Sequence, residues 1–175
     1  MTGITALEEP DNDTTANAGE QLPPLVFMRF RPAWSYIDGI REFTEFFCRT
    51  TFNDTNLAER ARMIIQETLE NAVKYSSPGP RSELELVINA SEESMEISVA
   101  SKPDPQHLGA LRQQVEELYE RDPESAYLAA FRRAASNPEA SARLGLARIR
   151  YEGNVELELD CNDDGRIRIT AKGKI

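Results

Sequence analysis

Three side chains in the stretch QETLENAVKYS have types and a spacing suited to phosphate chemistry. Glu67 and Asn71 are four residues apart, so on a helix both side chains lie on the same face. A carboxylate can orient and partly deprotonate a hydroxyl group or a water molecule, and an amide oxygen can bind Mg²⁺ without adding charge. Lys74 borders the same face and can reach a phosphate. Asparagine is a mediocre helix former, so Asn71 in mid-helix suggests a role beyond local structure.

The same residues also have an ordinary interpretation. Glu70 and Lys74 have the i,i+4 spacing of an exposed ion pair, which adds only a few tenths of a kcal/mol to a helix. Taken alone, Asn71 is simply an amide on a helix surface. The surrounding elements and any wider motif therefore have to decide between the two interpretations.

Two helices are expected to position these side chains. Apolar residues recur with helical spacing over residues 33–50, and we interpret Trp34 and Phe43 in that stripe as core residues rather than as a ligand cage. The helix with the three polar side chains should follow an N-cap at Asn53 or Asn56. It should end at the sequence SSPGP, because proline and glycine do not continue a helix.

The rest of the chain predicts a sheet covered by helices. The segments LVFMRFR, ELELVINA and MEISVAS are typical of strands, and the last two form a hairpin. Residues 106–136 should form two helices that separate near Asp122, a short helix should follow Pro138, and a hairpin around NDDG should close the chain. This order predicts an α/β (α+β) two-layer sandwich with helices on one face of a mostly antiparallel, mixed sheet.

Length and composition indicate one folded domain. The chain has 175 residues, of which 40% are hydrophobic and 29% charged, as in a soluble globular protein. Residues 1–22 are polar and acidic without an apolar period, so we expect a disordered tail followed by a single domain at 23–175. No stretch approaches the roughly 20 apolar residues of a membrane span and no signal peptide is recognisable, which predicts a cytoplasmic location without membrane contact.

The charge and the few cysteines exclude several classes of site. A net charge of -10 and a pI near 4.7 argue against nucleic-acid binding, which depends on clustered Lys and Arg, and favour a protein partner or a metal-chelated ligand. Cys48 and Cys161 are isolated in the sequence, so we expect two core thiols rather than a disulfide framework or a zinc site. His107, the only histidine, is expected in the first turn of a helix without a catalytic role.

The stretch from Glu67 to Tyr75 resembles a known motif. Its sequence E-T-L-E-N-A-V-K-Y is similar to the N-box of the GHKL ATPases, a superfamily that includes histidine kinases. With RFRPAWSYIDGIREF before it, the form E-x-x-x-N-A-V-K is most similar to anti-sigma-factor serine kinases of the RsbW type. The segment from SVASKPDPQ to LGLARI also resembles SiaB-type kinases, which phosphorylate a small STAS-like partner protein. Together these similarities span about residues 25–173.

The resemblance implies a Bergerat fold, in which ATP lies between the helix with Asn71 and a helical lid at about 106–142. In that arrangement Asn71 would hold Mg²⁺, Glu67 would act on the attacking hydroxyl group, and Lys74 would face phosphate. The implied activity is phosphorylation of a STAS-like antagonist or a sigma factor on Ser or Thr, so ATP and Mg²⁺ are the expected cofactors. Relatives of the RsbW type dimerise, which adds a homodimer to the expectations.

Two glycine motifs of the superfamily are altered in this sequence. Where D-x-G-x-G would follow the MEISVA strand, Ser101 takes the position of the aspartate that contacts adenine, and Asp104 is the nearby candidate to replace it. The second motif, G-x-G-L, appears with Arg143 at its first glycine and Gly145 at its second. An arginine there obstructs the backbone approach to phosphate, but its guanidinium group can itself bind a phosphate or a partner carboxylate.

Three functional interpretations therefore stay open. The protein is a GHKL-type kinase, a catalytically inactive pseudokinase that keeps the fold as a protein-interaction module, or a structural dimer. Nucleotide-binding candidates are Asn71, Lys74, Ser101, Asp104, Arg143 and Gly145. The arginines near the expected lid are interpreted as solvated helix faces or, alternatively, as a basic patch that receives an acidic partner or phosphates: Arg132, Arg133, Arg143, Arg148 and Arg150.

Overall fold

Ten elements follow one another in the order that the sequence predicts. The computed structural model describes residues 24–77, 79, 82–91, 93–136, 141–162 and 165–174, so the expected tail at 1–22 lies outside the described residues. In chain order the elements are β1 (Val26–Phe30), α1 (Trp34–Phe52), α2 (Thr55–Tyr75), β2 (Leu84–Ala90), β3 (Ser94–Ser101), α3 (Pro105–Tyr119), α4 (Pro123–Ser136), α5 (Ser141–Glu152), β4 (Glu156–Cys161) and β5 (Ile167–Lys174).

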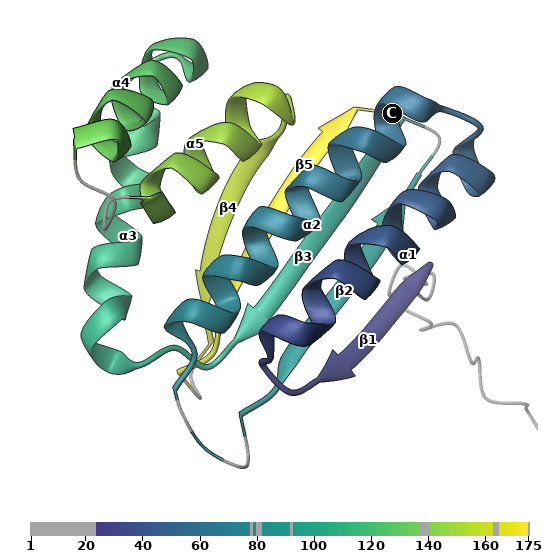
Figure 1. Cartoon of the computed structure of the whole chain (residues 1–175), viewed down its shortest axis with the longest axis horizontal. Helices are drawn as coiled ribbons and strands as arrows, with labels where there is room; N and C mark the ends of the chain where they lie inside the picture. Colours follow the sequence, from purple (N-terminus) through teal and green to yellow (C-terminus); the bar gives the residue numbers. More distant parts are fainter. Residues whose placement is uncertain are drawn as a thin grey trace, which may run out of the picture.

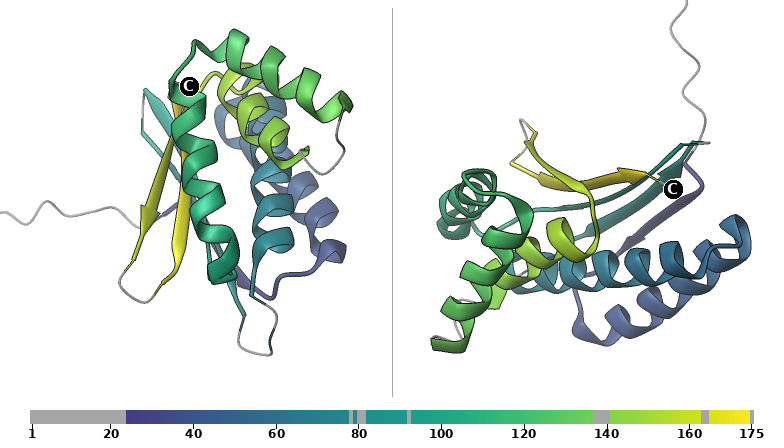
Figure 2. Two further views of the ribbon diagram at one scale, coloured as in Figure 1. Left: turned by 90° about the vertical axis from the view of Figure 1, so that its left-hand side faces the viewer. Right: turned by 90° about the horizontal axis from the view of Figure 1, so that it is seen from above.

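The five strands form one sheet with the order β1-β2-β3-β5-β4. All four strand pairings are antiparallel, so the expected mixed character is absent from the described sheet. Figures 1 and 2 show the helices on one side of this sheet, which confirms the two-layer α/β sandwich. Because β5 pairs with both β3 and β4, the C-terminal hairpin completes the sheet beside the central hairpin.

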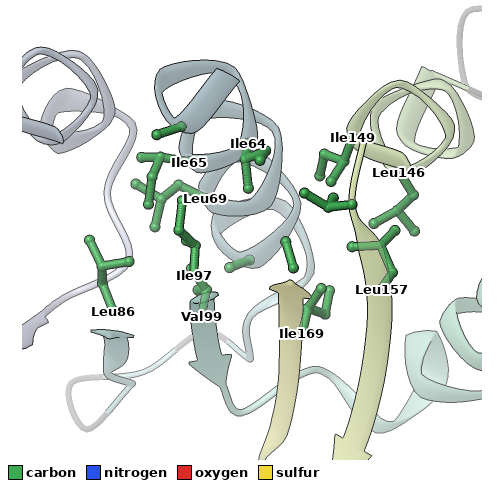
Figure 3. Close-up of a cluster of buried hydrophobic side chains, with 14 of the residues drawn as sticks. Ile64, Ile65, Leu69, Leu86, Ile97, Val99, Leu146, Ile149, Leu157 and Ile169 are labelled. Atoms are coloured by element: carbon green, nitrogen blue, oxygen red, sulfur yellow. The ribbon is translucent and has the colours of Figure 1, made fainter. Parts of the chain in front are cut away.

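The core lies between this sheet and two helices, α2 and α5 (Figure 3). Ile65 and Leu69 of α2 are fully buried, and so is Ile149 of α5. The inward face of the strands supplies the opposite half of the core: Leu84, Leu86, Ile88, Ile97, Val99, Leu157 and Ile169. Each large side chain buried in this way contributes roughly 1.5–3 kcal/mol to stability. The packing therefore fixes the rotation of α2 and, with it, the direction of its polar side chains.

The start of α2 differs in detail from the expectation. Asp54 is the N-cap, and its carboxylate accepts a hydrogen bond from the backbone N–H of Leu57 at 3.0 Å. Asn53 instead ends α1 in a left-handed conformation, with φ of 52°. The prediction of Asn53 or Asn56 was therefore wrong, because the tight α1–α2 turn needs a residue that tolerates positive φ directly before the cap.

Several side chains expected in the core are exposed. Trp34 is 59% exposed, and Phe43 and Phe46 on the same helix also contact solvent. The expectation of Trp34 and Phe43 as core residues was therefore wrong, since α1 is covered by α2 and the sheet on only one side. Cys48 is buried, as expected of a core thiol, whereas Cys161 at the end of β4 is exposed.

Two helices, α3 and α4, occupy the segment expected to form the lid. They separate at Asp122, as the sequence predicts, and His107 lies in the first turn of α3 against the ring of Tyr75. Figure 1 places α3 beside β4, with α4 packed on α5. In the part of the chain that the structure describes, no helix is both long enough and apolar enough to cross a membrane.

Candidate functional site

A groove of about 570 Å³ lies on the outer side of the helical layer. Its lining comes from four helices: Trp34 of α1; Glu67, Glu70, Asn71 and Lys74 of α2; Tyr127 and Phe131 of α4; and Leu144, Gly145, Arg148 and Glu152 of α5. The right-hand view of Figure 2 shows α1 and α4 farthest from the sheet, with α2 and α5 between them and the strands. The groove therefore unites residues that are far apart in the sequence.

Glu67 projects from α2 toward α5. Its Oε1 accepts a hydrogen bond from Arg148 at 3.1 Å, and only 17% of its side chain is exposed. Arg148 also donates to Glu152, at 2.7 Å. Burial raises the pKa of Glu67 above its ordinary range, although Arg148 acts in the opposite direction. A raised pKa makes the carboxylate a stronger base, which suits the role that its type and position predict.

Asn71 lies one turn further along α2 and has an unsatisfied amide. The residue is only 7% exposed, and its Nδ2 atom has no hydrogen-bond partner among the described residues. A buried polar group without a partner costs about 1–3 kcal/mol, so such groups often mark a missing ligand. The side chain that the sequence assigns to Mg²⁺ is thus one of five described residues with a buried side-chain atom that lacks a partner, and the atom concerned is a hydrogen-bond donor.

Gly145 brings α5 into contact with this pair. A Cβ atom at Gly145 would lie 2.6 Å from Oε2 of Glu67 and 3.5 Å from Nδ2 of Asn71. A larger residue at this position would therefore force the Glu67 carboxylate to move, whereas its contact with Asn71 would be ordinary. The second glycine motif and the N-box, which are distant in the sequence, meet at this one contact.

Lys74 lines the same groove, in the last turn of α2. Its Nζ atom lies 5.3 Å from the ring centroid of Tyr75, a cation–π distance. Glu70 accepts a hydrogen bond from Gln66 at 3.0 Å. The simple Glu70–Lys74 ion pair is not among the ion pairs of the described residues, so the ammonium group remains available to an anion in the groove.

Ser101 and Asp104 lie at the junction of β3 and α3, apart from the groove lining. Ser101 is only 4% exposed and pairs with Ile167 of β5. Asp104 is the N-cap of α3, where its carboxylate accepts a hydrogen bond from the N–H of Gln106 at 2.9 Å. Its own N–H donates to the carbonyl of Tyr75, so this junction supports the end of α2.

Arg143 turns away from the groove and pairs with Glu117 of α3 at 3.0 Å. Arg133 of α4 approaches the same carboxylate at 3.7 Å, beside a second hollow of about 330 Å³ between α3, α4 and α5. Arg150 donates to the backbone carbonyls of Leu118 in α3 and of Arg121 after it, and its guanidinium group lies over Tyr119. These arginines therefore join helices to one another rather than forming a free basic patch.

The sequence placed Arg148 only in a possible basic patch, not beside Glu67, and it gave the aromatic residues of the groove no site role. Arg148 appeared only as one of several helix arginines, and its partner Glu67 is 81 residues away. Phe131 is 54% exposed, and like Trp34 it was hidden in an ordinary apolar helix pattern. No local signal marked these aromatic residues, because helical periodicity does not show which apolar positions stay uncovered in the fold.

Comparison with known proteins supports the fold. No family profile and no curated protein matches the sequence. A chain in the crystal structure of the SiaB–SiaC complex from Pseudomonas aeruginosa superposes with a TM-score of 0.64, over 87% of this chain and 91% of that chain, at 16% sequence identity. An identity this low establishes a common fold and nothing finer. The protein described here therefore shares the fold of a chain from a two-protein assembly.

Proposed function

We propose that this protein is a regulatory signalling protein that binds a partner protein and phosphorylates it on Ser or Thr from Mg-ATP. The observation that carries the proposal is the buried Asn71 amide without a partner, in a groove that also contains Glu67 and Lys74. Its Nδ2 atom is a hydrogen-bond donor, so an acceptor in the groove, such as a phosphate oxygen, would satisfy it.

The polar groups of the groove fit the phosphate and metal side of a nucleotide. Asn71 would hold Mg²⁺ through its amide oxygen, and Lys74 would neutralise phosphate charge. Among the described residues no group of three or more His, Cys, Asp or Glu side chains could hold a metal ion alone, which suits a magnesium ion that arrives with ATP. ATP supplies the transferable phosphoryl group. Glu67 would accept the proton of the partner's hydroxyl group once Arg148 releases the carboxylate.

The partner half of the proposal is supported by the fold. The similar chain was crystallised in a complex of two proteins, SiaB and SiaC. Together with the sequence resemblance to RsbW-type and SiaB-type kinases, this supports a STAS-like protein or a sigma factor as the partner. The acidic character of the chain, with a net charge of -10, is consistent with a protein partner rather than a nucleic acid.

Isothermal titration calorimetry tests the nucleotide half directly. Native protein should bind Mg-ATP, and Asn71→Ala should abolish or weaken that binding at least tenfold while leaving the fold intact by circular dichroism. Asn56→Ala is the matched control, because Asn56 is exposed in the first turn of the same helix. Absence of saturable heat up to millimolar Mg-ATP would reject nucleotide binding and, with it, the kinase.

A second candidate is the catalytically inactive pseudokinase, favoured by the Arg148–Glu67 ion pair and by Ser101. The ion pair occupies the carboxylate that would act on the substrate hydroxyl, and Ser101 offers no carboxylate to an adenine. This candidate predicts partner binding without phosphate transfer. Incubation with γ-labelled ATP and a purified partner separates the two: transfer that disappears in Asn71→Ala eliminates the pseudokinase.

A further inference from the structure

Three aromatic side chains line the groove together with its polar residues. Trp34 of α1, with Tyr127 and Phe131 of α4, forms what we call the aromatic rim. Trp34 is 59% exposed and Phe131 is 54% exposed, and the two residues line the same groove from different helices. The rim comes from two helices, α1 and α4, which lie on different sides of α2 in Figure 1.

The rim on α4 is held in place by further stacking. The rings of Tyr127 and Tyr151 stack with centroids 5.2 Å apart and an interplanar angle of 23°. Phe131 continues this series at 6.5 Å from Tyr127, tilted by 43°. A ring system that is already ordered loses little entropy when a planar ligand is added to it, so the exposed face of Phe131 is ready for stacking.

The two residues that the superfamily resemblance places against adenine, Ser101 and Asp104, do not line this groove. Ser101 is nearly fully buried in the sheet and does not line the groove, and Asp104 is occupied as the cap of α3. A nucleotide whose phosphates contact Asn71 and Lys74 must therefore place its base against other residues of the groove.

We propose that the aromatic rim binds the purine base of the nucleotide by stacking. This inference rests on the proposed function, because it takes the ligand of the groove to be a nucleotide. Stacking involves the faces of the rings, which all purines share, so recognition of the base is tolerant. ATP and GTP should therefore bind with dissociation constants within about tenfold of each other, unlike a site built around a base-specific hydrogen bond.

The protein carries its own probe for this test, since Trp34 is the only tryptophan. Binding of Mg-ATP or Mg-GTP should change the fluorescence of Trp34, whereas magnesium tripolyphosphate, which has no base, should bind about tenfold more weakly and leave the fluorescence unchanged. Phe131→Leu should raise the Kd of ATP about tenfold without changing the Kd of tripolyphosphate. Phe46→Leu is the matched control, an exposed aromatic residue of α1 outside the groove lining.

The outcomes separate this inference from the proposed function. If native protein and Phe131→Leu bind ATP equally well by calorimetry, or if tripolyphosphate binds as tightly as ATP, the base does not stack on the rim, although the nucleotide site stands. If Phe131→Leu weakens only the binding of a partner protein, the rim is a docking surface and the inference is overturned. If native protein binds no nucleotide at all, the proposed function itself fails.

Discussion

Residues that the sequence links to nucleotide binding occur at two places, the contact between α2 and α5 and the junction between β3 and α3. The two places differ in whether their polar groups have hydrogen-bond partners within the chain. At the α2–α5 contact, Asn71 has a buried N–H group without a partner among the described residues, and Glu67 has a raised pKa. At the β3–α3 junction, Asp104 caps a helix, and Ser77 donates to the carbonyl oxygens of Lys102 and Pro103.

This difference separates a site from a structural joint. A joint is stable because each polar group finds a partner within the chain, so nothing there improves when a ligand binds. A site retains groups that folding leaves unsatisfied or perturbed, and these lower the free energy only when a ligand arrives. By this criterion the α2–α5 contact is the candidate site, and the β3–α3 junction supports it.

Substitution of Gly145 should have the largest effect on the unfolding free energy. Gly145→Ala places a Cβ atom 2.6 Å from Glu67 Oε2, so the carboxylate has to move and its hydrogen bond with Arg148 is disturbed; overpacking of this kind costs about 1–3 kcal/mol of unfolding free energy. Gly109→Ala is the matched control, because Gly109 is also inside a helix and an added Cβ atom meets nothing within 4 Å. It should raise the unfolding free energy by about 0.5–1 kcal/mol through helix propensity. Urea denaturation measures both values, and equal gains would contradict the close contact.

Removal of the N-cap of α3, at the β3–α3 junction, should have the next largest effect on the unfolding free energy. Asp104→Ala should lower the unfolding free energy by about 1 kcal/mol, because the backbone N–H of Gln106 loses its acceptor. Asn71→Ala should cost nothing, since its Nδ2 atom has no partner to lose among the described residues and alanine is the better helix former. If Asn71→Ala proved as destabilising as Asp104→Ala in urea denaturation, Asn71 would be a structural residue and the contrast would disappear.

The sequence predicted the elements well because each has a strong periodic pattern. Glu67 and Asn71 were placed on one helix face by their spacing alone, and Gly145 was linked to them through the motif that it resembles. The cap was misplaced because Asn53, Asp54 and Asn56 are all good caps, and only the turn geometry decides among them.

The composition of the groove could not be predicted from local patterns. The period of α1 shows that Trp34 shares a helix face with apolar residues, but it does not show where the covering layer ends. The pairing of Arg148 with Glu67 joins two helices that are distant in sequence. Arg143 belongs to the same helix as Arg148, yet it points to Glu117 of α3 instead. Such choices depend on tertiary packing, which a single sequence does not display.

The contribution of Glu67 to the unfolding free energy should change with pH by a smaller amount, in a direction that its pKa shift defines. Burial raises the pKa of Glu67, so the folded protein binds this proton more tightly than the unfolded chain does. The resulting stability is fully present below the unfolded-state pKa, about 4.3, and is lost as the pH rises through the folded-state pKa. From about pH 4 upward, the unfolding free energy of the native protein should therefore fall relative to that of Glu67→Gln, as measured by urea denaturation at each pH.

Glu85 supplies the control of opposite sign. Its burial acts to raise its pKa, but Arg166 and Arg29 outweigh burial and lower that pKa below the ordinary range. Stability from Glu85 is therefore present above the unfolded-state pKa and is lost as the pH falls through the folded-state pKa. Native protein should gain stability relative to Glu85→Gln as the pH rises. If both variants showed the same sign, the environment assigned to Glu67 would be wrong.

Substitution of Arg143 should have the smallest effect. Its ion pair with Glu117 is about one-third exposed on each side, so Arg143→Ala should change the unfolding free energy by less than about 1 kcal/mol. Because Arg143 does not line the groove, the Kd of Mg-ATP measured by calorimetry should also stay unchanged, whereas Arg148→Ala should change it. A tenfold loss of ATP affinity in Arg143→Ala would return this arginine to the nucleotide site. The nucleotide site would then include Arg143 and its contact with Glu117 of α3.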